Sequence, residues 1–280
     1  MPLQRSAKWR AWVLLWARVT VFVLILAGAR PAAAEFEIQE STIDPGEIQL
    51  QYRGAWHSGL PTGEIGPILP DDEVAPLRQS HEFELQFSVT SHWLLALTHA
   101  FDEAIDDNFS LTAIEAESQV ELITLVGNGL GLAVQSGIEQ PLQRAREEEP
   151  FSYHFGPIVE LSQNKFLLTL NPLFFKETGD LAEQEGFGFE YGWQAKYDVT
   201  KRLALALEMF GEVEDMANAG PFDEQEHSLG PAFYIHFERE WEEGGKEKSR
   251  ELVLSLGAQF GLTDATSDVA LKVFIGYEYY

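Results

Sequence analysis

Apolar and polar side chains alternate over long stretches of this chain. In the clearest stretch, residues 187–199 (FGFEYGWQAKYDV), every odd-numbered residue is aromatic or aliphatic and every even-numbered residue is polar or glycine. A β-strand places successive side chains on opposite faces, whereas a helix would scatter both sets around its axis. The segment is therefore predicted to be a strand with one wholly apolar face.

The same two-sided pattern recurs and predicts an all-β fold, a transmembrane antiparallel β-barrel of about twelve strands. The predicted strands are residues 47–53, 82–89, 94–101, 114–122, 130–139, 153–161, 166–175, 187–199, 203–210, 228–238, 252–261 and 269–280. A secreted, water-soluble β-sandwich also has alternating strands and is the competing interpretation. The barrel is favoured because the apolar faces are free of charge in strand after strand.

The predicted connections alternate in length, as in barrels with long external loops and short periplasmic turns. The long ones are residues 56–80, 102–108, 140–150, 177–185 and 214–226, and the short ones are 90–92, 126–129, 162–164 and 200–202. The alternation fails near the end of the chain. Residues 239–250 are long where a short turn is expected, and residues 262–267 are short where a loop is expected. Ten or fourteen strands therefore remain open.

The last predicted strand, residues 269–280 (VALKVFIGYEYY), has one apolar face and finishes the chain on two tyrosines. Chains that end in this way resemble bacterial outer-membrane β-barrels, in which the final strand is the signal read by the insertion machinery. The resemblance implies that Tyr277, Tyr279 and Tyr280 form this insertion signal and that the barrel-insertion machinery is a partner. Tyr280 lies one residue out of register with the apolar face, which ends at Tyr279.

The N-terminus has the order of regions typical of a secretory signal peptide. Basic residues come first, an apolar run follows at residues 19–29, and Ala32, Ala33 and Ala34 form a small-residue cleavage site. Arg18 interrupts the longer apolar stretch, which argues against a retained membrane helix. We therefore predict a signal peptide at residues 1–34, a short periplasmic lead-in at residues 35–45 and a single barrel domain at residues 46–280.

The amino-acid composition limits the kinds of partner and site that the protein can have. The predicted leader holds five of the 19 basic residues and none of the acidic ones, which leaves 14 basic against 45 acidic residues. A chain this acidic lacks the basic footprint that nucleic acid requires, so no nucleic-acid partner is expected. Cysteine is absent, which excludes disulfides and thiolate metal sites. No segment after residue 34 is apolar enough over roughly 20 residues to span a bilayer as a helix, so a barrel is the membrane-spanning form left.

The segment FGFEYGWQAKYDVTKRLALALEMFGE (residues 187–212) and the closing strand carry a narrower resemblance. They are similar to a group of outer-membrane barrels that includes the proteins of the meta-pathway of phenol degradation. This resemblance implies a place in the outer membrane of a Gram-negative bacterium, in contact with its lipids and lipopolysaccharide. It also implies passage or binding of small, often hydrophobic, solutes, and it supplies no catalytic residue.

The sequence contains no recognisable enzyme or metal signature. None of the histidines has a serine two residues on, the spacing that places a base and a nucleophile on one strand face. His-x-His and His-x3-His spacings are absent, and the acid runs do not match a calcium loop. We therefore predict no catalytic, cofactor-binding or metal-ligating residue and no cofactor.

The polar faces of the predicted strands define a candidate site, the barrel lumen. Its predicted lining is Glu47, Arg53, Glu82, Glu84, Glu115, Glu117, Glu121, Glu190, Lys196, Glu208, Glu212 and Lys272. An acidic ring selects cations or cationic solutes over anions. The expected function is passive passage or binding of small hydrophobic or cationic solutes. A structural or surface-interaction barrel with a plugged lumen is the alternative, and an outer-membrane enzyme is a distant third.

Overall fold

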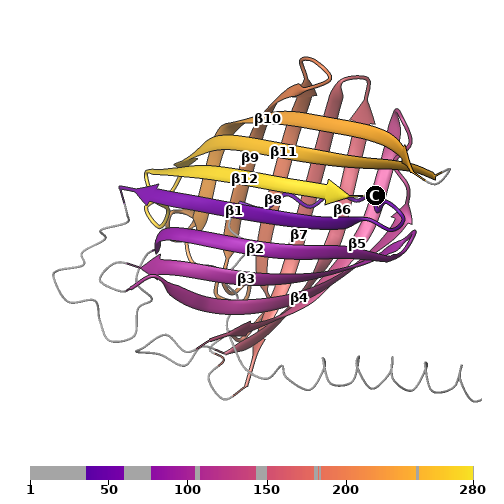
Figure 1. Ribbon diagram of the computed structural model, residues 1–280. Helices are drawn as coiled ribbons and strands as arrows, with labels where there is room; N and C mark the ends of the chain where they lie inside the picture. The colour runs from indigo at the N-terminus through magenta and orange to yellow at the C-terminus, as the bar shows by residue number, and fades with distance from the viewer. Residues whose placement is uncertain are drawn as a thin grey trace, which may run out of the picture.

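The computed structural model describes residues 36–59, 77–104, 108–142, 150–179, 182, 184–243 and 246–279 as a closed antiparallel barrel (Figure 1). Its twelve strands are β1 (Ile48–Ser58), β2 (Leu77–Thr90), β3 (Trp93–Ala104), β4 (Ser110–Ile123), β5 (Gly129–Pro141), β6 (Phe151–Gln163), β7 (Phe166–Thr178), β8 (Gly188–Asp198), β9 (Leu203–Val213), β10 (Glu226–Glu243), β11 (Lys246–Gly261) and β12 (Val269–Tyr279). One short 3-10 helix, η1 (Phe222–Glu224), lies between β9 and β10. The predicted fold class and strand number are confirmed.

The strands follow one another around the ring in chain order, and the ring closes where β1 pairs with β12. The closing register runs from Ile48 opposite Tyr279 to Ser58 opposite Val269. The start of β1 and the end of β12 lie at the end of the barrel that carries the short turns, here called the short-turn end; the opposite end is the long-connection end (Figure 1). Among the described residues no helix is long and apolar enough to cross a bilayer.

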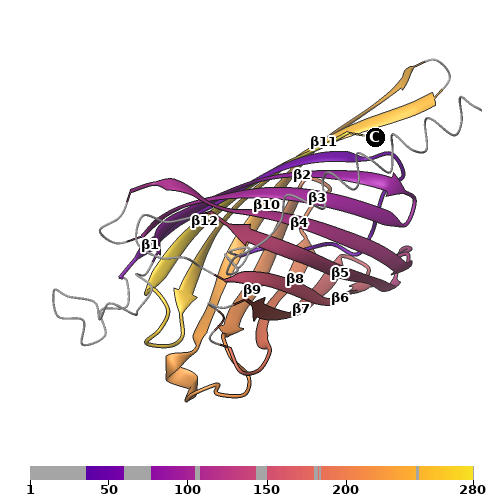
Figure 2. The same cartoon turned by 90° about the horizontal axis from the view of Figure 1, so that it is seen from below.

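The apparent failure of loop parity near the end of the chain has a simple cause. Residues 239–243 and 246–250 continue β10 and β11 as a paired hairpin, with Arg239 opposite Arg250. Pairing with β9 stops at Ile235 and pairing with β12 stops at Arg250, so the hairpin beyond these points has only two strands. It projects past the barrel at the short-turn end (Figure 2). What looked like a long loop is therefore strand, and the expected alternation of connections holds.

Burial in this barrel is reversed relative to a water-soluble protein. Most buried side chains are polar or charged, and many large apolar ones are exposed on the outside, such as Leu85, Leu207, Leu256 and Leu271. Exposed aromatic residues mark both ends of the wall: Trp56, Phe109, Phe155, Phe187 and Phe260 at the long-connection end, and Phe87, Trp93, Phe166, Tyr197, Phe237 and Tyr277 at the short-turn end. Two aromatic girdles around an aliphatic band are typical of transmembrane barrels and exclude the sandwich.

The terminal predictions have different outcomes. Ala32 and Ala34 of the predicted cleavage site, and Tyr280, lie outside the described residues, so the signal peptide stays a prediction. Of the predicted periplasmic lead-in, residues 35–45, the structure describes residues 36–45, and these lie inside the barrel. Ser41 is fully buried against the wall, and Ile43 is buried with Leu94 and Ala96 of β3. The segment fills space between distant strands, where polar wall residues supply hydrogen bonds that a free lead-in would lack.

Gly230 of β10 packs directly against the backbone of β11. A side chain at Gly230 would place its Cβ 1.7 Å from the carbonyl oxygen of Ala258 in β11. We expect Gly230→Ala to lower the free energy of unfolding by about 1–3 kcal/mol, the usual effect of overpacking. Urea unfolding in detergent, read by the heat-dependent gel shift, measures it. Gly129→Ala is the control, because the nearest atom to its Cβ is 3.6 Å away; equal losses in both variants would contradict this packing.

Candidate functional site

The residues predicted to line the lumen lie on strand faces that point into the barrel, or, for Glu47, directly before β1. Glu47, Arg53, Glu82, Glu84, Glu121, Glu208 and Lys272 are buried, and Glu115, Glu117, Glu190, Lys196 and Glu212 are half-buried. The structure joins some of them directly and leaves others facing further acidic residues. Their role in selecting solutes is not tested by position alone.

Arg53 is the centre of a buried charged cluster. Its Nε donates to Glu82 Oε2 at 2.7 Å and its Nη2 donates to Glu84 Oε2 at 2.7 Å. Its Nη1 donates to Glu37 of the segment inside the barrel. The side chains of Arg53, Glu82 and Glu84 are 7%, 7% and 0% exposed. Because a buried carboxylate needs a charge partner, one guanidinium supports three acids, two from β2 and one from the segment before β1.

A second cluster surrounds Glu208, whose side chain has no exposed surface. Lys272 Nζ donates to Glu208 Oε2 at 2.6 Å, and Gln194 Nε2 donates to Glu208 Oε1 at 2.8 Å. Tyr234 donates its hydroxyl to the same Oε1 at 2.5 Å. Both carboxylate oxygens are therefore satisfied by donors from β8, β10 and β12, which is how a fully buried carboxylate is tolerated.

The segment from Phe36 to Gly46, here called the inner segment, crosses the lumen on a chain of polar contacts. Asn171 clamps Gln39, because its Oδ1 accepts the Gln39 backbone N–H at 2.7 Å and its Nδ2 donates to the Gln39 carbonyl at 3.0 Å. Glu160 Oε2 accepts both the backbone N–H of Ser41, at 2.9 Å, and its hydroxyl, at 2.5 Å. Wall side chains thus replace the backbone partners that a strand would have.

The inner segment also reaches every Lys and Arg on the inward faces of the described strands. Glu37 pairs with Arg53, and Glu40 Oε1 lies 3.2 Å from Lys196 Nζ. The carbonyl oxygen of Phe36 accepts from Lys272 Nζ at 3.1 Å. These three cationic side chains are therefore all bound by the inner segment, and the remaining lining is strongly acidic.

Several functional residues were missed by the sequence prediction. They are the inner-segment acids Glu37 and Glu40, and the wall residues Asp102, Glu139, Glu160, Glu177, Glu251 and Glu278. Glu139 and Glu160 lie on the polar faces of two strands that the alternation had already predicted, so their position was available from the pattern. Glu37 and Glu40 had no such signal, because the inner segment is not a strand.

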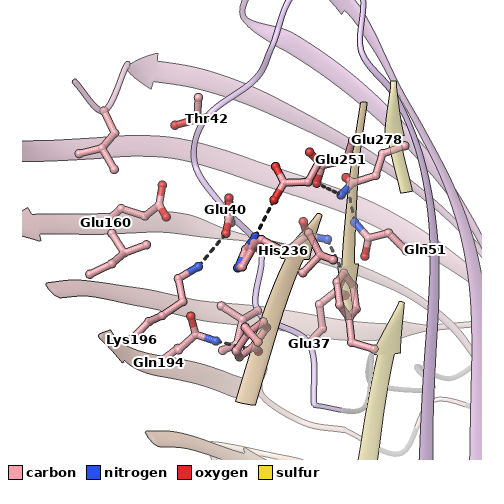
Figure 3. Close-up of a pocket in the computed structure, with 18 of the residues that line it drawn as sticks. Glu37, Glu40, Thr42, Gln51, Glu160, Gln194, Lys196, His236, Glu251 and Glu278 are labelled. Atoms are coloured by element: carbon pink, nitrogen blue, oxygen red, sulfur yellow. Dashed lines mark hydrogen bonds and ion pairs between the residues drawn. The ribbon is translucent and has the colours of Figure 1, made fainter. Parts of the chain in front are cut away.

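A cavity of about 790 Å³ lies between the inner segment and the short-turn end. Its lining mixes both charges, as Figure 3 shows: Lys196 points to Glu40, and His236 Nδ1 meets Glu251 Oε1 at 2.6 Å. Turn residues such as Asn164 and Lys201 form part of its lining. The lumen therefore has a vestibule at the short-turn end, and the inner segment separates it from a more acidic half.

Asp215 fastens two connections at the long-connection end. Its carboxylate accepts backbone N–H groups from Ala217 at 2.8 Å, and from Glu185 and Gly186 at 2.9 Å each. The N–H of Ala217 contributes most to holding the pKa of Asp215 below its usual range. The ionised carboxylate of Asp215 is the form that accepts these three N–H groups. The two connections are therefore held together at neutral pH, and this contact is lost as the pH falls through the lowered pKa.

Arg53 provides a stability test of the lumen. Arg53→Gln leaves the buried Glu82 and Glu84 without their cation, so we expect the free energy of unfolding to fall by about 3–5 kcal/mol. Arg78→Gln is the matched control: Arg78 forms an ion pair with Glu103, but its side chain is 53% exposed. Exposed pairs are worth about 0–1 kcal/mol, so this control is expected to unfold almost like the parent. A similar, small loss in both variants would contradict the proposed importance of Arg53.

No known protein family matches the sequence, and no curated protein matches it. Solved structures are similar only in outline. The KdgM porin in complex with disordered oligogalacturonate matches at a TM-score of 0.46 and 8% identity, over 83% of this chain and 98% of that one. The Acinetobacter baumannii outer membrane protein Omp33 matches at 0.40 and 7% identity, over 84% and 97%. LpxR from Salmonella typhimurium matches at 0.41 and 10% identity, over 83% and 99%.

Similarities this distant supply no residue-level correspondence, and the narrower resemblance to the meta-pathway barrels stays a prediction. The assignment of the fold rests on the molecule itself. Its closed ring, apolar exterior with aromatic girdles and polar lumen are those of an outer-membrane β-barrel.

Proposed function

We propose that this protein is an outer-membrane channel through which small solutes diffuse passively, with a preference for cations. The observation that carries the proposal is the charge of the lumen. The acidic side chains named above dominate the lining, whereas the inward Lys and Arg of the described strands are Arg53, Lys196 and Lys272. Acidic pore linings attract cations and repel anions, because the low-dielectric wall focuses their field. We infer no enzymatic role for these residues.

The topology supports an orientation. Termini and short turns of outer-membrane barrels face the periplasm, and long connections face outward. In this orientation the acidic half of the lumen opens to the cell exterior and the mixed-charge vestibule opens to the periplasm. The lipid-facing girdles would contact membrane lipids and lipopolysaccharide. Tyr277 and Tyr279 on the outer face of β12, with the terminal Tyr280, would serve as the signal for the insertion machinery.

The inner segment favours a second candidate, a barrel whose lumen is plugged. It spans from Phe36, packed on Phe210, to Ile43, packed on Leu94. In this alternative the barrel acts through its outer surface, and nothing passes. A closed resting state and a permanently plugged barrel would have the same structure, so movement of the inner segment distinguishes them.

The contacts of the inner segment are of the kind that exchange readily. From Phe36 to Ile43 the backbone bonds are made to side chains such as Asn171, Glu160 and Lys272, and not to a neighbouring strand. Each such bond can be replaced by water at a net free energy of only about 0.5–1.5 kcal/mol, or more where a charge takes part. The adjacent vestibule offers space into which the segment can move. We therefore propose that it is a movable constriction.

Ion selectivity tests the acidic lumen. We expect the purified barrel to give discrete, cation-selective conductance steps in a planar bilayer. Glu84→Gln combined with Glu190→Gln removes two inward charges while keeping side-chain size, so the reversal potential in a salt gradient should move toward that of a non-selective pore. Asp223→Asn combined with Glu224→Gln removes two exposed charges from η1 and is the control. Unchanged selectivity in the lumen variant would refute the proposed role of these acids.

A reversible cross-link tests the movable constriction. The chain has no cysteine, and a Cβ at Gly131 would lie 2.3 Å from Ser41 Oγ. Ser41→Cys combined with Gly131→Cys therefore brings two thiols within disulfide reach. Oxidation should tie the inner segment to β5 and reduce the mean conductance, and a reducing agent should restore it. The two single variants control for the substitutions.

The outcomes of this cross-linking experiment separate the alternatives. If oxidation of the double-cysteine variant leaves the conductance unchanged, solutes pass a fixed inner segment. A correctly folded parent barrel that never conducts would support the plugged barrel and refute the channel.

A further inference from the structure

A cluster of possible metal ligands lies inside the barrel and takes no part in the contacts described above. His154 of β6 extends into the lumen between two carboxylates of β4. Its Nδ1 lies 3.2 Å from Glu115 Oε1, and its Nε2 lies 3.1 Å from Glu117 Oε1. One ligand atom from each of the three residues can be chosen so that all lie within 4.8 Å of one another. His154 is 5% exposed.

A gap in the intervening strand makes this contact possible. His154 and Glu117 lie on strands that do not pair with each other, and between them Gly137 of β5 is directly opposite both. A Cβ at Gly137 would lie 2.3 Å from His154 Nε2 and 3.0 Å from Glu117 Cγ. The imidazole and the carboxylate therefore meet across the missing side chain. Neighbouring strands are about 4.8 Å apart, so a side chain at this position would separate them.

Two buried hydroxyl groups adjoin the cluster without a hydrogen-bond partner among the described residues. Thr98 of β3 is 2% exposed and lies directly opposite Glu115 of β4. Ser152, with no exposed surface, lies two residues from His154 and opposite Glu139. Leaving a buried hydroxyl unsatisfied costs about 1–3 kcal/mol. Oxygen atoms held in this way beside carboxylates indicate that a further binding partner belongs here.

The local charge balance points to a cation as this partner. Glu139 is directly opposite Glu115, and Glu84 faces Thr98 from the other side. On the inward face of β1, Arg53 is already bound by Glu82, Glu84 and Glu37. A single positive charge would offset only half the charge of the Glu115 and Glu117 carboxylates. A divalent ion would add two positive charges and would also bind oxygen.

We propose that Glu115, Glu117 and His154 form a binding site for a divalent first-row transition-metal ion, with Zn²⁺ as the best match. Imidazole nitrogen suits Zn²⁺ better than Ca²⁺ or Mg²⁺, and carboxylate oxygens complete the donor set that Zn²⁺ accepts. The Thr98 hydroxyl lies on the side of the site facing β3, where it can bind the ion or a water on it. The site lies in the acidic half of the lumen, and it stands whether or not the barrel conducts.

Zn²⁺ itself is the probe for this site. The full barrel, purified in detergent and treated with a chelator, is titrated with Zn²⁺ by calorimetry, and one ion per barrel is expected. His154→Ala should weaken binding at least about tenfold, since an aligned ligand is lost. His236→Ala is the matched control, because His236 also faces the lumen and contacts a carboxylate, Glu251, yet belongs to no three-ligand cluster among the described residues. It should bind Zn²⁺ like the parent.

A further variant covers the possibility that His154→Ala does not fold, which the heat-dependent gel shift would reveal. Glu117→Gln keeps the size of the side chain and its reach across Gly137, and it too should weaken Zn²⁺ binding about tenfold. The proposal is overturned if the parent barrel binds no Zn²⁺ in the micromolar range. It is equally overturned if folded His154→Ala or Glu117→Gln binds as tightly as the parent, or if His236→Ala alone abolishes binding.

Discussion

The pairing of β1 with β12 is the contact on which the rest of this structure depends. It removes the two free edges that an open twelve-stranded sheet would present, so every strand in the wall has two neighbours. Closure also separates two environments. Leucine and aromatic side chains on one face of each strand meet lipid, and carboxylates on the other face meet each other. A shift of one residue in any strand would exchange these faces, so the hydrophobic pattern and the closed ring specify the same register.

Enclosing so many carboxylates creates an electrostatic problem that the molecule solves locally. Arg53 supports three acids, and Lys272 belongs to a network that satisfies both oxygens of Glu208. The inner segment enters the same networks: it brings further acids to Arg53 and Lys196, and a carbonyl oxygen to Lys272. The lumen is therefore stabilised by charged hydrogen bonds in place of an apolar core. Such bonds are directional, yet water can replace them at a small net cost in free energy.

The inner segment and the His154 cluster contribute differently to the charge of the lumen. The segment uses the available positive charge, which leaves the acidic half of the lumen to attract cations from outside the protein. The gap at Gly137 is where the wall itself concentrates nitrogen and oxygen ligands. A metal ion bound there would partly neutralise the acidic half, so occupancy of the site and the selectivity of the lumen are expected to depend on each other through ordinary electrostatics.

The strands and their faces can be predicted from the sequence, because alternation with period 2 is a local property of each strand. The alternation placed Glu84, Glu190 and Lys272 on inward faces without knowledge of any partner. Tertiary structure alone decided which of these residues meet. His154 reaches Glu117 only because β5 lies between them with a glycine at that position, and Ser41 reaches Glu160 only because the barrel closes around the inner segment. The sequence predicts a long connection at residues 239–250, because the strand segments 239–243 and 246–250 are rich in charged residues and lack an apolar face. Contacts across a lumen join residues far apart in sequence, so no local pattern records them.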